Sequence, residues 1–316
     1  MKTPSSYIGI DVSKKTLHVA TPEKFLGEFA NTVSGIESLI KRLHTLHAKA
    51  VVLEASGGYE SLVRELMQDS LLPVCVVQPS CVRHFAKSIK VLAKTDKIDA
   101  VVIARFGEAT KPRITPKTPE NTRKLRVLSH RRAQLVEDRV RESNRLETCA
   151  DSEMIEQLQE SIKRLQQAEK ALNQQISALR QSDPALRRKS EILTRQKGIG
   201  EQTVNVLLSH FPELGSLTRQ QVAALAGLAP HPRESGAWKG KRRIYGGRAE
   251  VRKAMYMAAK TAARWCPVIS VFYKRLREGG KSYNVALIAC ARKMLVRLNT
   301  QLKERSELSP DGTSTT

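Results

Sequence analysis

The sequence predicts two fold classes in one chain, an α/β domain over residues 1–110 and a mainly α-helical remainder. Short β-branched runs alternate with segments of helical spacing up to about residue 110, which is typical of an α/β domain. Three prolines between Lys111 and Pro119 then exclude regular helix and central strand, so this segment predicts a linker. After the linker, apolar residues recur at helical spacing.

Five segments of the first domain predict strands, and the residues between them have helical spacing. The expected strands are Tyr7 to Asp11, Thr16 to Ala20, a weak one near Glu28, Ala50 to Glu54, and Pro73 to Val77. This order resembles the ribonuclease H-like fold, in which carboxylates on the first and fourth strands meet one from a C-terminal helix. The sequence therefore predicts acids gathered at neighbouring strand ends.

Four acids occupy such positions. Asp11 and Glu54 each end an apolar strand, and Asp96 and Asp99 are three residues apart, so on a helix they share one face. Four oxygen donors in one place suit Mg²⁺ or Mn²⁺. Each acid also has an ordinary interpretation: Asp11 caps a turn, Glu54 is a solvated strand end, and Asp96 is the N-cap of a helix that Asp99 then opens.

A heptad follows the linker, within a connector expected over residues 111–183. One seam position holds Ile155, Ile162, Glu169 and Ile176, and the other holds Leu158, Leu165, Leu172 and Leu179. Isoleucine and leucine in these places favour a two-stranded coiled coil. A break is expected near Asp151, so the two halves either form an antiparallel hairpin inside one chain or pair with a second molecule; a helix packed on its own domain is the alternative.

Residues 184–305 contain two features that suit phosphate binding. Lys197, Gly198 and Gly200 lie in a turn between helical runs that resembles a helix-hairpin-helix element, although a simple tight turn has the same pattern. A glycine-punctuated loop from Arg233 to Lys253 then holds eight basic residues and two acids. The expected nucleic-acid contacts in that loop are Arg233, Lys239, Lys241, Arg242, Arg243, Arg248 and Arg252.

Ser235 stands at the start of this loop, next to Gly236. Surrounding cations lower the cost of a serine alkoxide and stabilise a phosphoryl transition state, so Ser235 is a candidate nucleophile. The alternative is that Ser235 caps a turn and the cluster is a plain DNA-binding face. Tyr245 is a rival nucleophile that ranks well below Ser235, because stacking or packing explains it better.

Composition agrees with a nucleic-acid substrate. The 316 residues include 54 Lys and Arg against 31 Asp and Glu, giving a net charge of +23 and a pI near 10.1. The sequence contains neither a long apolar run nor a signal peptide, so we expect a cytosolic protein without a membrane partner. Five cysteines without a CxxC pair predict reduced thiols, with no disulfide and no zinc. The polar residues 306–316 predict a disordered tail.

The motifs around Asp11, Glu54, Asp96–Asp99, Gly198–Gly200 and Ser235 occur in the order of one family. From about residue 7 to about residue 300, the chain resembles the DEDD transposases of bridge-RNA-guided insertion sequences, relatives of the pilin-gene invertase. The resemblance implies a RuvC-like domain whose four acids hold Mg²⁺ or Mn²⁺, and a transposase domain whose nucleophile is Ser235. It further implies site-specific recombination through a 5′-phosphoserine intermediate.

The same resemblance implies partners: target and donor DNA, a structured noncoding bridge RNA, and a homodimer that assembles into a homotetramer, in nucleoid-associated bacterial cytosol. Subgroups of the family differ around the serine loop, where residues 243–248 of this chain replace a serine- and lysine-containing version. Two other functions fit parts of the sequence. One is a RuvC-like Holliday-junction nuclease that uses metal-activated water, and the other is a packaging protein without catalysis.

Overall fold

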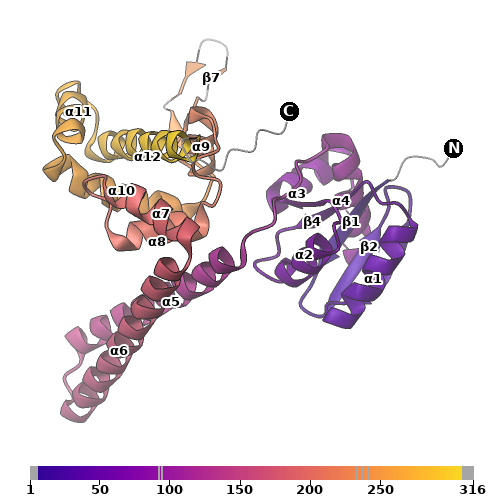
Figure 1. The fold of residues 1–316 in the computed structure, drawn as a ribbon, viewed down its shortest axis with the longest axis horizontal. Helices are drawn as coiled ribbons and strands as arrows, with labels where there is room; N and C mark the ends of the chain where they lie inside the picture. Colours follow the sequence, from indigo (N-terminus) through magenta and orange to yellow (C-terminus); the bar gives the residue numbers. More distant parts are fainter. Residues whose placement is uncertain are drawn as a thin grey trace. The chain divides into compact units, whose positions relative to one another are not determined.

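The protein is described by a computed structural model covering residues 6–91, 93, 95–232, 234–235, 238–240 and 242–307 (Figure 1). It divides into two units, Met1–Lys117 and Thr118–Thr316, each with its own hydrophobic core. The boundary falls inside the proline-rich segment that the sequence predicts as a linker. The further division of the second unit at residue 183 stays a prediction.

The first unit is a five-stranded mixed sheet with helices on both faces, which confirms the α/β class. The sheet order is β3-β2-β1-β4-β5; β1 pairs antiparallel with β2 and parallel with β4. The strands are β1 (Tyr7–Val12), β2 (Thr16–Ala20), β3 (Phe25–Ala30), β4 (Ala50–Glu54) and β5 (Val74–Val77). The helices are α1 (Val33–Thr45), α2 (Glu60–Asp69), α3 (Pro79–Ser88) and α4 (Asp96–Thr110).

Two apolar layers hold this sheet. Ile8 and Ile10 of β1 pack with α1 and α2 on one face, whereas Tyr7 packs with α3 and α4 on the other. Because side chains alternate along a strand, Gly9 and Asp11 share the α4 face with Tyr7. A Cβ atom at Gly9 would overlap the backbone of α4, so this glycine allows the helix to lie directly on β1.

The linker after α4 follows the edge of the sheet. Residues 111–119 have no regular secondary structure, as their prolines predict. Thr115 nevertheless pairs with β5: its amide donates to the Val74 carbonyl at 2.7 Å, and its hydroxyl accepts from the Val76 amide at 2.8 Å. Gln68 of α2 donates to the Thr115 carbonyl at 2.7 Å. The first part of the linker therefore belongs structurally to the sheet.

The second unit is mainly helical, as predicted, and its described residues also form four strands of two residues each. Its helices are α5 (Glu120–Thr148), α6 (Ser152–Ser182), α7 (Pro184–Thr194), α8 (Glu201–His210), α9 (Arg219–Leu225), α10 (Ala249–Trp265), α11 (Pro267–Glu278) and α12 (Tyr283–Glu307). Its strands are β6 (Pro230–His231), β7 (Glu234–Ser235), β8 (Trp238–Lys239) and β9 (Arg243–Ile244). Helix α12 extends two residues into the expected tail, and residues 308–316 lie outside the described ones.

Helices α5 and α6 form an antiparallel hairpin within the chain (Figure 1). The expected break is present, since Asp151 caps α6 by accepting from the Met154 amide at 2.9 Å. Glu169, the polar residue in the heptad, pairs with Arg132 of α5 at 2.6 Å. Of the two alternatives for this pair of helices, the structure shows the intramolecular hairpin; a coiled coil with a second molecule stays a prediction. Within the described part of the chain, no helix is long and apolar enough to cross a membrane.

Candidate functional site

The four acids singled out by the sequence line one cavity of the first unit. Asp11, Glu54, Asp96 and Asp99 all contribute to its wall, and its volume is about 300 Å³. They come from three segments that are far apart in the chain, namely β1, β4 and the first turn of α4. The fold therefore brings together the residues that the sequence predicts as a metal site.

The local structure explains this convergence. β1 and β4 are parallel neighbours with Ile10 opposite Leu53, so the residues that follow, Asp11 and Glu54, lie at the same edge of the sheet. Helix α4 begins at Asp96 because Thr95 caps it: the Thr95 hydroxyl accepts a hydrogen bond from the Ile98 amide at 3.3 Å. This first turn lies at the same edge of the sheet as Asp11 and Glu54. The cap is Thr95, so the alternative interpretation of Asp96 as the N-cap is wrong. Asp96 is left as a first-turn residue with an exposed carboxylate.

Electrostatics at the cavity suits a cation. Burial raises the pKa of Asp11, and the nearby charges of Asp96 and Asp99 raise it further, while His18 and a backbone hydrogen bond oppose this. Like charges held this close, in a partly buried place, are stabilised by a positive ion between them. The oxygen-rich donor set therefore fits the hard divalent ion that the sequence predicts.

Basic side chains on α3 face the same cavity and were missed from sequence. Arg83 and Lys87 line it, and both are exposed. They are four residues apart, so they share one face of the helix. That spacing is a weak signal in so basic a chain, and only the packing of α3 beside α4 distinguishes them. Their charges suit a phosphate backbone next to the acids.

His18 was also missed. It lies on β2 directly opposite Asp11, and it is 7% exposed. One ligand atom each from Asp11, His18 and Asp96 lie within 4.8 Å of one another. The sequence signal was a polar residue inside the apolar run Thr16–Ala20, but a lone histidine in a strand gains meaning only once the pairing register is known.

Ser235 occupies a very different setting in the second unit. It is an exposed residue of β7, opposite Trp238 of β8. The next pair of short strands, β6 and β9, connects this hairpin to the helical core, with Pro230 opposite Ile244. Arg233, Gly236 and Lys241, which the sequence places around the serine, lie outside the described residues. The serine is thus displayed at the surface on a small β-structure, and its nucleophilic role stays a prediction.

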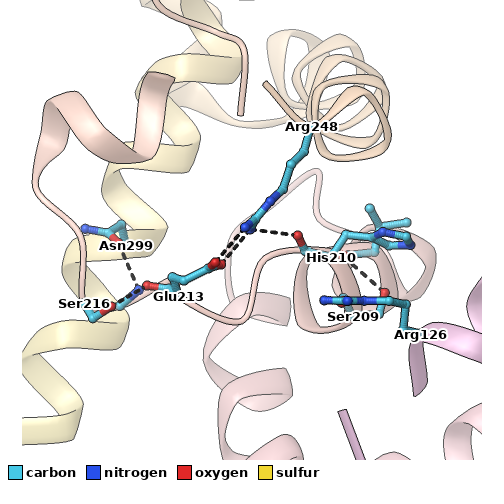
Figure 2. Close-up of polar contacts among 9 residues, drawn as sticks. Arg126, Ser209, His210, Glu213, Ser216, Arg248 and Asn299 are labelled. Carbon is cyan, nitrogen blue, oxygen red and sulfur yellow. Dashed lines mark hydrogen bonds and ion pairs between the residues drawn. The ribbon is translucent and has the colours of Figure 1, made fainter. Parts of the chain in front are cut away.

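Arg248 anchors the C-terminal side of this structure (Figure 2). Its guanidinium donates to both carboxylate oxygens of Glu213 at 2.6 Å and to the His210 carbonyl at 3.0 Å, and it lies over the ring of Phe211. Burial raises the pKa of Glu213, but the hydrogen bonds and charge of Arg248 more than offset this and leave that pKa lowered. This arginine is predicted as a nucleic-acid contact, and in the structure its guanidinium is bound to other residues of the second unit.

The remaining predicted contacts differ in exposure. Arg242 and Arg243 are exposed, and both line a cavity of about 810 Å³. Arg252 donates to the Gly246 carbonyl at 2.6 Å. Lys197 is exposed, and Gly200 is the N-cap of α8.

Two other residues of this unit have clear structural roles. Gly198 has a φ of +96° and packs against α10, where a side chain would overlap the helix. Tyr245 is 66% exposed, with its ring 4.3 Å from that of His231. The glycine therefore fixes the turn that the sequence singled out, and the ring of the tyrosine lies tilted against that of His231.

Comparison with known proteins covers both units. Residues 8–155 match the DEDD transposase model of the IS110 type, described as a transposase, and residues 190–274 match the model of the transposase IS116/IS110/IS902 family. The chain is 28% identical over 315 residues to the pilin gene-inverting protein of Moraxella lacunata, covering 92% of this chain and 93% of that protein. The Moraxella bovis protein of the same name gives the same values.

A third relative matches a shorter stretch. An uncharacterized 43.6 kDa protein of insertion element IS110 from Streptomyces coelicolor is 31% identical over 113 residues, covering 35% of this chain and 28% of that protein. The two family models together span well over half of the chain. They include the four acids in the first match and Ser235 in the second.

Proposed function

The chain belongs to the IS110-type DEDD transposases, enzymes that act on DNA, and we propose that it recombines DNA by using the acid cavity and Ser235 together. One observation carries the proposal. Four acids from separated segments line a single cavity, and the one serine that matches the family motif is exposed on a basic hairpin. On this proposal the acid cavity would hold a divalent ion and Ser235 would supply the attacking hydroxyl.

We propose a ribonuclease H-like, RuvC-like fold for the first unit. Its support is the sheet order β3-β2-β1-β4-β5, with an antiparallel β1–β2 pair and a parallel β1–β4 pair. In this arrangement the acids of the first and fourth strands meet those of α4, which is the convergence that the sequence predicts. The strand order argues for the fold independently of the family match.

Asp11, Glu54, Asp96 and Asp99 would hold the divalent ion, Mg²⁺ or Mn²⁺. When bound, such an ion neutralises charge that develops on a phosphodiester during cleavage. The family match implies use of a divalent metal, and the acid cluster is present. Arg83 and Lys87 on the same cavity would position the DNA backbone against the acids.

Ser235 would perform the covalent step. Its Oγ attacks the phosphorus of a phosphodiester and forms an Oγ–P bond, while the bond from phosphorus to the 3′-oxygen breaks. The proton lost from the serine appears on the released 3′-hydroxyl. A 3′-hydroxyl of the second strand then attacks the phosphoserine, which restores the phosphodiester and the serine. The number of phosphoester bonds is conserved, so the reaction needs no ATP.

We propose target and donor DNA as substrates and a structured bridge RNA as the source of sequence choice. The family assignment implies DNA. The net charge of +23 provides ample attraction for two nucleic acids, and a protein guided by RNA pairing does not need to read bases itself. The setting would be the nucleoid of a bacterial cytosol.

We propose a homodimer that assembles into a homotetramer through the α5–α6 hairpin. The heptad side chains of α6 supply the support, because Ile155, Ile162 and Leu165 are only half-buried within the hairpin. Val127 and Val140 of α5 are 68% and 47% exposed. A second hairpin would cover these apolar side chains.

A test of the covalent step uses the full chain with the element's flanking DNA and its noncoding RNA. After denaturation we expect a protein–DNA adduct that protease removes. Ser235→Ala and Asp11→Asn should both lose the adduct. Ser216→Ala is the matched control, because Ser216 is another exposed serine of the same unit.

The outcomes separate the rival functions. Cleaved DNA without an adduct, retained in Ser235→Ala and lost in Asp11→Asn, would replace this proposal by a junction nuclease that uses metal-activated water. DNA binding without cleavage in the wild-type protein would favour the packaging function. An adduct that survives in Ser235→Ala would assign the attack to another residue, such as Tyr245.

A further inference from the structure

A buried nitrogen donor lies next to two of the cavity acids, Asp11 and Asp96, and is not one of the four acids that the sequence singles out. His18 is on β2, and its side chain is 10% exposed, whereas the neighbouring carboxylates of Asp96 and Glu28 are 64% and 53% exposed. Its Nδ1 atom has no hydrogen-bond partner within the described part of the chain. A buried polar atom left without a partner is costly, so it needs an explanation.

The sheet register shows where the ring points. Asp11, His18 and Glu28 are directly opposite one another on β1, β2 and β3, so their side chains share one face of the sheet. This is the face covered by α4, where Asp96 begins the helix. His18 therefore lies between Asp11 on one side and Glu28 on the other.

The two ring nitrogens have different surroundings. Nε2 lies 3.5 Å from a carboxylate oxygen of Glu28, and Nδ1 lies 4.0 Å from a carboxylate oxygen of Asp96. The carboxylate of Glu28 is the nearer of the two, so it favours the tautomer that carries the proton on Nε2. That tautomer leaves a lone pair on Nδ1, toward Asp96. Carboxylate–histidine pairs orient metal ligands in the same way.

From this geometry we propose that His18 Nδ1 is a ligand of the divalent ion held by Asp11 and Asp96, oriented by Glu28, and that it biases the site toward a transition ion such as Mn²⁺ over Mg²⁺. The inference rests on the proposed function, since it concerns the same cavity. The 4.0 Å between Nδ1 and the Asp96 carboxylate oxygen would leave room for one ion that both atoms could bind. Mg²⁺ prefers oxygen ligands and keeps its waters, whereas imidazole suits transition metals.

The test uses Mn²⁺ bound to the full chain, without DNA. Pulsed electron paramagnetic resonance should detect coupling of the manganese spin to an imidazole nitrogen in the wild-type protein. His18→Asn should remove this coupling and reduce the Mn²⁺-over-Mg²⁺ preference, measured by calorimetry, by about tenfold or more. Glu28→Gln keeps the side-chain shape and should weaken Mn²⁺ binding by about 10- to 100-fold, as loss of an orienting partner does.

Two further variants assign the signal. His44→Ala removes an exposed histidine of the same unit and should leave coupling and affinity unchanged. Asp11→Asn should weaken Mn²⁺ binding, which ties the signal to the cavity. Circular dichroism of each variant checks that the unit is folded, and Glu28→Gln still tests the ligand geometry if His18→Asn fails to fold.

The failures are distinguishable. Mn²⁺ bound in an Asp11-dependent way but without nitrogen coupling would overturn the inference and leave the proposed function standing. Affinity lost in His18→Asn without coupling in the wild type would make His18 a positioning residue, which also overturns the ligand assignment. An absence of saturable Mn²⁺ binding in the wild-type protein would overturn both the inference and the proposed metal site.

Discussion

Asp11 and Ser235 stand on supports of very different size. Asp11 belongs to the central strand of a five-stranded sheet with apolar layers on both faces. Ser235 belongs to a two-residue strand that, within the described residues, pairs with another of the same length. The difference follows from what each group must do: metal ligands need fixed mutual distances, whereas a nucleophile that attacks a large substrate needs exposure. Substitutions in the two regions should therefore affect different properties of the protein.

The largest expected effect is chemical and belongs to the sheet. Glu54→Gln keeps the size of the side chain and removes a charge from the cavity, so strand cleavage should fall by about 10³-fold, or about 4 kcal/mol of barrier. Single-turnover cleavage measures it. Asp69→Asn, which changes an exposed acid of the same unit, is the control and should cleave normally. Normal cleavage by Glu54→Gln would show that the cavity tolerates loss of one acid.

The next effect is on stability, again in the sheet. Gly9→Ala introduces a Cβ that overlaps the backbone of α4, and the resulting strain should reduce the free energy of unfolding by about 2–3 kcal/mol. Urea unfolding measures it. At Gly200 a Cβ would meet open space, so Gly200→Ala should cost about 1 kcal/mol or less. Equal losses in the two variants would contradict the close contact between β1 and α4.

The third effect concerns the Glu213–Arg248 pair, whose arginine follows the short strands that carry Ser235. The folded-state pKa of Glu213 is lowered below its ordinary value of 4.5, so the stability contributed by the pair with Arg248 is complete above that value and is lost as pH falls through the folded-state pKa. Glu213→Gln should reduce the free energy of unfolding by about 1–2 kcal/mol at neutral pH. In this variant the stability should also fall less as the pH is lowered. Unfolding midpoints across pH test this, with the exposed Glu156→Gln as control. If the variant loses stability at low pH as steeply as the wild-type protein, the Glu213–Arg248 pair does not cause the pH dependence.

A smaller effect should appear in DNA binding by the hairpin region. Arg243→Gln removes one exposed cation, so affinity should fall similarly for all DNA sequences, and the slope of log K against log salt should decrease by about 0.9. Fluorescence anisotropy at several salt concentrations measures it. Lys163→Gln, an exposed change on α6, is the matched control. A sequence-dependent loss would instead indicate direct reading of bases by Arg243.

The smallest effect is expected at Tyr245. Tyr245→Phe keeps the ring that lies against His231 and removes the hydroxyl, so formation of the covalent adduct should be unchanged. Quantifying the adduct by gel after denaturation is sufficient. Loss of the adduct in this variant, with retention in Ser235→Ala, would transfer the nucleophile to the tyrosine.

Sequence reasoning was correct where a residue's position depends on its own segment. Asp11 and Glu54 end short apolar runs that predict strands, and neighbouring parallel strands bring their ends together. It failed where the role depends on pairing across the fold. His18 became meaningful only through its register with Asp11 and Glu28, and the two partners of the Arg248–Glu213 pair are 35 residues apart.

The sequence also does not show whether a basic side chain faces solvent or pairs with an acid of the same unit. Arg248 looks like its basic neighbours in the loop, yet its guanidinium is bound to Glu213 inside the unit. Charge density predicts that a loop attracts phosphate, but it does not say which cations are already paired. The cations that remain free for phosphate are identified only once the acids elsewhere in the fold are placed. Here that acid is Glu213, in the turn after α8.

The strand-like pairing of Thr115 has a consequence for how the protein behaves in concentrated solution. A five-stranded open sheet has two edges at which a foreign strand could add and start aggregation. Thr115 occupies the hydrogen-bonding groups of Val74 and Val76, so β5 offers little of its edge to another molecule. The opposite edge, β3, carries the charged Glu28 and joins β2 across an irregular register near Val19. Both borders of the sheet are thereby protected against self-association of the β type.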